Sequence, residues 1–324
     1  MRVPARFLMA LILAAAAGPA LSPAAGQSPP QVQEFAVAGN HPHDVAPASD
    51  GGVWYTSQFT GELGHLDPAT GRSRLIKLGE GSSPHGVVTG PDGAAWVTDQ
   101  GLNAIVRVDG RTGAVRVFRI GDRNISAHTP AFDRRGTLWF TGQRGFYGRL
   151  DPASGRIQLF DAPRGNGPYG IAAAPSGEVW FASLAQSYIA RINPADGQVT
   201  VFEPPTARQG ARRVWPDSKN RVWVSEWNSG NLSMFDPGAN RWRAWKLPGA
   251  RPQAYAVYVD ERDMVWVTDF QGDANRIVRF DPATERFETF TLSRNAQVRQ
   301  LLGRPGEVWG AESGTNKLVV IRTR

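Results

Sequence analysis

The sequence predicts an all-β protein, a seven-bladed β-propeller of four-stranded antiparallel blades whose last blade is closed by the N-terminal strand. Three observations lead to this fold class. One Trp-centred repeat returns seven times, each repeat contains four short strand patterns, and the last repeat ends one strand early. Four strands in a unit of about 40–45 residues are typical of propellers and not of helical repeat proteins.

An apolar residue followed by Trp marks the same position in every repeat. Successive Trp residues of this kind lie 41 to 43 residues apart. The seven are Trp54, Trp96, Trp139, Trp180, Trp223, Trp266 and Trp309. A large ring that recurs once per blade predicts packing between neighbouring blades. Of the other four Trp, Trp215 and Trp227 either line a ligand surface or pack on edge strands.

Turn residues divide each repeat into strands. In the second repeat an inner strand at residues 86–89 is followed by Asp92-Gly93 and then by the Trp strand, which predicts a hairpin. A third strand commonly ends in Asp-Pro, as at Asp67-Pro68, where Pro fixes φ and Asp can cap the turn. A fourth strand completes the unit.

The two ends of the chain are predicted to share one blade. The seventh repeat stops after its third strand, "KLVVIRTR", while residues 31–38 have the pattern of a fourth strand. Pairing of these two segments would close the ring through backbone hydrogen bonds and remove an exposed sheet edge.

The N-terminus has the pattern of a secretory signal peptide over residues 1–26. Arg2 and Arg6 precede an apolar run at residues 7–17, and small residues, including Ala24 and Gly26, mark the cleavage region. Residues 27–324 then form a single propeller domain, which we expect to be periplasmic or secreted. The chain has no Cys, so no disulfide can stabilise it. No later segment is apolar enough to predict a membrane span.

Charge and motifs exclude several classes of function. The net charge is +7, but Arg residues are spread through every repeat, which argues against a nucleic-acid partner. The sequence contains no nucleophile elbow, phosphate-binding loop or zinc-protease motif. A closed ring buries its own strand edges, so we expect a monomer that binds a small molecule or cyclic peptide in the mouth of its channel.

Positions equivalent in all repeats form rings around the channel of a propeller. Eleven residues before each Trp stand His43, His85, His128, Tyr169, Arg212, Tyr255 and Val298. Three of the five His of the chain therefore share one ring on consecutive blades. Three residues after each Trp stand Ser57, Asp99, Gly142, Ser183, Glu226, Asp269 and Glu312. Imidazoles near carboxylates can exchange protons near neutral pH or bind a divalent cation; alternatively, the His only bond loop backbone.

Two segments carry a resemblance to a known family. "PHGVVTGPDGAAWVTDQGLNAIVRVDGRTG" and "PYGIAAAPSGEVWFASLAQSYIARINPADG" are similar to repeats of the virginiamycin B lyases, the streptogramin B lyase propellers. The resemblance covers essentially the whole chain after the signal peptide. It implies an enzyme that opens a cyclic depsipeptide antibiotic by elimination across its ester bond, with a His base and a divalent metal such as Mg²⁺.

The resemblance also implies which residues act. It places the imidazoles at His43 and His85 and one carboxylate at Asp99, whereas Ser83 occupies the position of the family's other carboxylate. Glu312 keeps the family's acid, although its repeat has Val298 in place of His. The implied metal ligands are Asp99 and Glu312, and a reduced carboxylate set weakens a Mg²⁺ site.

Two functions follow as hypotheses. The first is a metal-assisted carbon–oxygen lyase that opens a cyclic depsipeptide or related ester, in which His85 removes a proton and His43 protonates or positions the departing oxygen, with Asp99 as the third catalytic residue. The alternative is a non-catalytic exported propeller that binds a small anionic or peptidic ligand. The residues predicted to bind the substrate or ligand are His128, Tyr169, Arg212, Tyr255 and Arg299.

Overall fold

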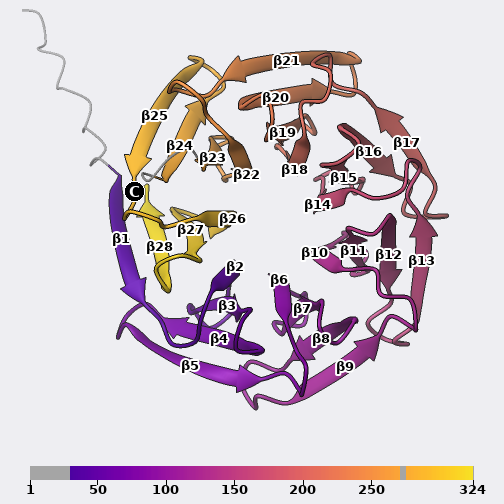
Figure 1. The fold of residues 1–324 in the computed structure, drawn as a ribbon, viewed down its shortest axis with the longest axis vertical. Coiled ribbons are helices and arrows are strands. Elements are labelled where there is room, and N and C mark those ends of the chain that lie inside the picture. The colour runs from indigo at the N-terminus through magenta and orange to yellow at the C-terminus, as the bar shows by residue number, and fades with distance from the viewer. Residues whose placement is uncertain (1–29, 271–274, 324) are drawn as a thin grey trace, which may run out of the picture.

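Seven four-stranded antiparallel sheets are arranged in a ring around a central axis (Figure 1), and inner-strand residues line a cavity on this axis, the channel of the propeller. The structure is a computed structural model that describes residues 30–270 and 275–323, and the predicted signal peptide lies outside the described residues. In the part that is described, no helix is long and apolar enough to cross a membrane. The seven-bladed propeller predicted from the sequence is confirmed.

Each blade runs from an inner strand at the channel to an outer strand at the rim. The inner strands are β2 (Pro42–Pro47), β6 (Pro84–Thr89), β10 (Ala127–Phe132), β14 (Pro168–Ala173), β18 (Ala211–Pro216), β22 (Ala254–Val259) and β26 (Val298–Arg304). The second strands are β3 (Val53–Ser57), β7 (Ala95–Asp99), β11 (Leu138–Gly142), β15 (Val179–Ser183), β19 (Val222–Glu226), β23 (Val265–Asp269) and β27 (Glu307–Glu312). The third strands are β4 (Glu62–Asp67), β8 (Ala104–Val108), β12 (Phe146–Leu150), β16 (Tyr188–Ile192), β20 (Asn231–Asp236), β24 (Arg276–Asp281) and β28 (Lys317–Arg322). The outer strands are β5 (Arg72–Lys77), β9 (Val115–Arg119), β13 (Ile157–Asp161), β17 (Val199–Phe202), β21 (Arg241–Lys246), β25 (Arg286–Thr291) and β1 (Gln31–Ala36).

The seven repeated Trp residues pack between blades, as predicted. Each is at most 2% exposed. Trp54 of the first blade lies in one apolar cluster with Val87, Val97 and Val106 of the second blade. Indole nitrogens commonly donate to a nearby carboxylate, as Trp223 Nε1 does at 3.0 Å. Burial of this ring at every blade interface therefore stabilises the circle as a whole.

The N-terminal strand closes the ring. β1 pairs antiparallel with β28 from Gln31 opposite Arg322 to Ala36 opposite Lys317 (Figure 1). Phe35 of β1 stacks on Trp309 with ring centroids 5.8 Å apart. The last blade is thus completed by the first strand of the domain, as the orphan strand pattern predicted.

This closure can be tested by two substitutions on β1. We expect Phe35→Ala to lower the free energy of unfolding by about 3 kcal/mol, because Phe35 is 8% exposed and its loss leaves a cavity against Trp309. Val32→Ala on the same strand is the control, since Val32 is 41% exposed and its truncation changes stability by only about 0.5 kcal/mol. Urea unfolding measures both, and equal effects would contradict a stabilising clasp.

Candidate functional site

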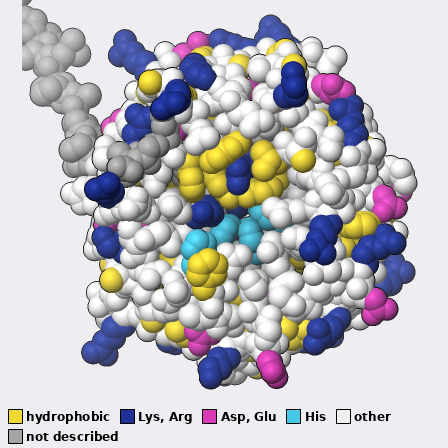
Figure 2. Space-filling view, in the orientation of Figure 1, with side chains coloured by type: hydrophobic (Ala, Val, Ile, Leu, Met, Phe, Trp, Pro, Cys, Tyr) yellow, Lys and Arg dark blue, Asp and Glu magenta, His cyan; other side chains and the backbone are white. Residues whose placement is uncertain are grey.

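The inner strands place the ring residues at one mouth of the channel. His43, His85, His128 and Tyr169 form a continuous stack in which neighbouring ring centroids lie 3.8 to 3.9 Å apart. In Figure 2 the His side chains lie in a central hollow together with hydrophobic and basic side chains. His43 and His85 keep 4% and 5% of their surface exposed, whereas His128 is fully buried. The first two imidazoles are thus the more accessible ones, and the predicted role of His128 in substrate binding stays a prediction.

Hydroxyl groups on the second strands keep the ring residues of neighbouring blades level with one another along the channel axis. Thr56 Oγ1 accepts the backbone N–H of Asp44 at 3.0 Å and donates to the carbonyl oxygen of His85 at 2.8 Å. Thr98 forms the equivalent bond to the carbonyl oxygen of His128 in the next blade. Each hydroxyl thus joins two blades directly behind the imidazoles.

A break in strand register turns a second residue of the first blade toward the channel. Every inner strand shifts register against its partner next to the ring position. Such an irregularity interrupts the alternation of side chains and can re-aim one of them. His43 therefore stacks on His85 while Asp44, the next residue, lines the channel interior.

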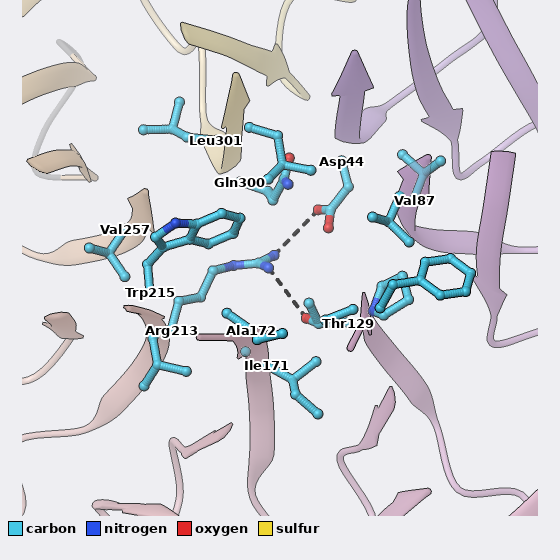
Figure 3. Close-up of a pocket in the computed structure, with 18 residues that line it drawn as sticks. Asp44, Val87, Thr129, Ile171, Ala172, Arg213, Trp215, Val257, Gln300 and Leu301 are labelled. Atoms are coloured by element: carbon cyan, nitrogen blue, oxygen red, sulfur yellow. Dashed lines mark hydrogen bonds and ion pairs between the residues drawn. The ribbon is translucent and has the colours of Figure 1, made fainter. Parts of the chain in front are cut away.

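Asp44 and Arg213 form an ion pair across the channel. His43 Nδ1 lies 2.8 Å from Asp44 Oδ1, and Arg213 Nη2 lies 3.3 Å from the same oxygen. Arg213 Nη1 donates to Thr129 Oγ1 at 3.3 Å, and that hydroxyl lies 2.8 Å from His128 Nδ1 (Figure 3). The Asp44 and Arg213 side chains are only 1% and 5% exposed. Through Asp44 and Thr129, Arg213 thus links the fifth blade to the first and the third.

Burial determines the charge state of the imidazoles. It lowers the pKa of His43 well below its usual value, and the Arg213 guanidinium lowers it further. Burial likewise lowers the pKa of His85 and His128, each with a contribution from the preceding His of the stack. Burial raises the pKa of Asp44, although Arg213 opposes that shift. The three His are therefore neutral near pH 7.

Aromatic side chains surround Arg212 on the opposite side of the mouth. The Arg212 guanidinium carbon lies 4.7, 3.5 and 4.4 Å from the ring centroids of Tyr169, Tyr255 and Trp227. Arg212 Nη2 donates to the Tyr169 hydroxyl at 2.8 Å, and that hydroxyl lies 2.6 Å from the Tyr255 hydroxyl. Arg299 lies 5.3 Å from the Phe270 centroid. Besides His128, the predicted binding residues are Tyr169, Arg212, Tyr255 and Arg299, and they give the mouth a cationic and aromatic wall.

The carboxylate of Asp99 bonds groups of its own blade. It accepts bonds from the Ser82 hydroxyl at 2.5 Å and from the backbone N–H groups of Ser83 and Leu102 at 2.9 Å each. Ser57 Oγ accepts the N–H of Asn40 in the same manner, so this ring position secures the loop that enters the inner strand. Its proposed catalytic role stays a prediction.

Glu312 is buried beside the ring closure. Its carboxylate accepts a bond from the Thr315 hydroxyl at 2.5 Å, and its Oε1 has no partner. Burial, with the charge of Glu34 in addition, raises the pKa of Glu312 to about 7. Neither Glu312 nor Asp99 belongs to the group of residues that the structure brings together for a metal.

That group consists of His43, Asp44 and His85. Their ligand atoms lie within 4.8 Å of one another, and no other group of three His, Asp or Glu residues this close occurs in residues 30–270 and 275–323. The three residues are thus close enough to hold a metal ion. The donor set does not suit Mg²⁺, however, because Mg²⁺ prefers oxygen ligands and the single carboxylate is already bonded to Arg213.

Sequence reasoning missed Asp44 and Arg213. Both stand ten residues before a repeat Trp, directly after a ring residue. Arg299 stands at the equivalent position of the last blade, but regular alternation of side chains would point all three residues away from the channel. Trp215, for which two roles were open, lies on inner strand β18 and lines the channel cavity.

Fold and site together define a propeller with a His-lined channel mouth. The chain belongs to the virginiamycin B lyase family, whose model matches residues 74–324. A search of curated proteins gives no match to this chain.

Solved structures agree with this family. Selenomethionine-substituted virginiamycin B lyase from Staphylococcus aureus is 18% identical with a TM-score of 0.83, over 91% of this chain and 99% of that one. A streptogramin B lyase is 19% identical with a TM-score of 0.82, over 91% of this chain and 98% of that one. A catalytically inactive virginiamycin B lyase from S. aureus, crystallised with quinupristin, is 18% identical with a TM-score of 0.83. That match covers 91% of this chain and 99% of the other. At these identities the likeness establishes the fold.

The buried imidazoles predict a loss of stability in acid. A His whose pKa is lowered by folding takes up a proton more readily in the unfolded chain, so stability is full above about pH 6.5 and falls as the pH drops below it. We expect His128→Phe to make this fall shallower by about 1 kcal/mol per pH unit. The raised pKa of Glu312 lowers stability as the pH rises, which is the opposite trend. This contribution is the same in the unsubstituted protein and in His128→Phe, so it cancels when their slopes are compared. Urea unfolding at a series of pH values measures the slopes, and parallel slopes would show that His128 is protonated in the folded state.

Proposed function

We propose that this chain is a carbon–oxygen lyase that opens a cyclic depsipeptide or a related ester by elimination at the channel mouth. The observation that carries the proposal is the bond between His43 Nδ1 and Asp44, next to His85 in the stack. A carboxylate that accepts the Nδ1 proton fixes the imidazole tautomer and leaves Nε2 as the basic nitrogen. Membership of the lyase family supports the same reaction class.

We assign removal of the proton to His43. The residues were expected to act in the reverse order, but only His43 has a carboxylate partner, whereas His85 Nδ1 is buried without one. His43 takes the proton from the carbon next to a carbonyl group, and the electron pair left behind forms a carbon–carbon double bond. The neighbouring carbon–oxygen bond breaks, and the ester oxygen departs as a carboxylate. No water is consumed, so product and substrate have equal mass.

Cationic side chains supply the charge stabilisation that this step needs. Negative charge develops on the substrate carbonyl and then on the departing carboxylate. Arg212 faces the mouth with a buried Nε that has no partner, and Arg299 adds a second positive charge near His43. Tyr169 and Tyr255 hold Arg212 in place. Fixed guanidinium groups thus provide the electrostatic stabilisation.

A macrocyclic substrate also needs an apolar surface at the mouth. Phe59 is 67% exposed, and the His41 ring stacks on it at 4.1 Å between centroids. His41 in turn lies 6.0 Å from His43. An exposed aromatic side chain so close to the imidazoles supports a peptidic or depsipeptide substrate.

The family resemblance implies Mg²⁺, and a bound divalent cation would polarise the substrate carbonyl. His43, Asp44 and His85 are the residues near enough to one another to hold an ion, but their chemistry fits Mg²⁺ poorly. The proposed elimination therefore relies on Arg212 and Arg299. A requirement for Mg²⁺ stays a prediction, as do export to the periplasm or medium, the monomeric state and a contribution to antibiotic resistance.

The reaction can be tested with a streptogramin B and a set of cyclic depsipeptides, with and without Mg²⁺, from about pH 6 to 9. We expect a ring-opened product of unchanged mass, detected by liquid chromatography and mass spectrometry. His43→Ala should reduce kcat/KM by about 100-fold or more, because it removes the general base. A product that has gained one water would contradict elimination.

His65→Gln is the control, because this variant also removes an imidazole. His65 lies away from the mouth, on third strand β4, against Trp54 and Asp50. It should leave turnover unchanged. If no substrate is opened while thermal shift still detects binding in His43→Ala/His85→Ala, the second hypothesis, a binding propeller, replaces the enzyme. The cationic and aromatic wall around Arg212 is the observation that favours that alternative.

A further inference from the structure

A second chamber lies in the channel beyond the ion pair. It has a volume of about 220 Å³ and is lined by inner-strand residues of all seven blades. Most of its wall is apolar and includes Val87, Ile171, Val257 and Leu301 (Figure 3). These residues follow the ring positions along their strands, so the chamber lies farther from the His mouth than the ring itself.

The chamber continues toward the opposite face of the propeller. Phe132, Ala173 and Trp215 line both this chamber and a wider depression formed by the turns after the inner strands. Carboxylates in that depression are already engaged: Asp217 accepts bonds from Trp223 and Arg221, and other Asp residues there bond indole groups in the same way. A ligand can therefore approach from the face opposite the proposed lyase site.

Arg213 provides the polar end of the chamber. Its side chain crosses the space beside Trp215 to reach Asp44 and Thr129 (Figure 3). Only the two terminal nitrogens have partners. The Nε atom has no hydrogen-bond partner, and it is buried, since the side chain is only 5% exposed. An unpaired guanidinium N–H in an apolar chamber is costly unless an acceptor bonds it.

The charges at the centre of the channel favour an anion. Arg212, Arg213 and Arg299 all act on His43, whereas Asp44 is the single carboxylate among them. The centre therefore carries more positive than negative charge, in a region shielded from water where charges interact strongly.

We propose that the far chamber is a second ligand site, which takes a small monocarboxylate with a compact apolar body, its carboxylate on Arg213 Nε and its body between Val87, Ile171 and Leu301. A dry cavity of about 150 Å³ holds benzene, so this volume suits an aromatic acid the size of benzoate. The site does not depend on the lyase reaction at the other mouth.

Benzoate is the probe for this site, with toluene as its uncharged counterpart. Isothermal titration should show benzoate binding to the full chain, about tenfold or more tighter than toluene, because a hydrogen bond to a charged group adds about 1.5 kcal/mol or more. No benzoate binding at millimolar concentration would overturn the proposal. Equal binding of toluene would overturn its anionic part.

Two variants locate the bound molecule. Ala172→Phe fills the chamber from β14 and should abolish benzoate binding, whereas Ala195→Phe at an exposed turn should leave it unchanged. Binding should also persist in His43→Ala/His85→Ala, which separates this site from the lyase site. Binding that survives Ala172→Phe, or that is lost with the two imidazoles, would contradict the assignment.

Nuclear magnetic resonance gives an answer even if Ala172→Phe fails to fold. In the unsubstituted protein, benzoate ring protons should show Overhauser contacts to the methyl groups of Ile171 and Leu301. Contacts only to Tyr255 or Phe59 would place benzoate in the other mouth and overturn the proposal.

Discussion

The buried ion pair between Asp44 and Arg213 fixes the centre of the channel. Arg213 extends from the fifth blade to a carboxylate of the first and a hydroxyl of the third, so one side chain sets the spacing of three blades. Removing one partner would leave the other charge buried and unpaired, which typically costs about 3–5 kcal/mol. The same carboxylate holds His43 Nδ1, and the same guanidinium closes the far chamber. The proposed base and the second ligand site therefore both depend on this pair.

The position of the carboxylate distinguishes this chain from the pattern that the family resemblance implied. Ser83 stands where one acid was expected, and Asp99, at the position of the other, accepts bonds from Ser82 and Leu102 in its own blade. The carboxylate that does contact an imidazole is Asp44, and it brings Arg213 with it. With Arg212, Arg213 and Arg299 near the imidazoles and Asp44 as their carboxylate partner, the mouth suits stabilisation of negative charge better than coordination of Mg²⁺.

The fold could be predicted from the sequence because its causes are local and repeated. An indole every 41 to 43 residues and the orphan strand at residues 31–38 determine the number of blades and the closure. The stack of His43, His85 and His128 followed from the same period. Asp44 and Arg213 could not be placed in this way, because regular alternation would point the residue after a ring position away from the channel. The register shift in each inner strand overrides that rule, and nothing in the Trp spacing encodes it.

The central claim is that His43 is a neutral base whose tautomer is fixed by Asp44, and the ¹⁵N chemical shifts of its imidazole test this most directly. At about pH 7, the account predicts a neutral ring with its proton on Nδ1, and Asp44→Asn should disturb that tautomer. An imidazolium at pH 7, or a neutral ring with its proton on Nε2, would contradict the account.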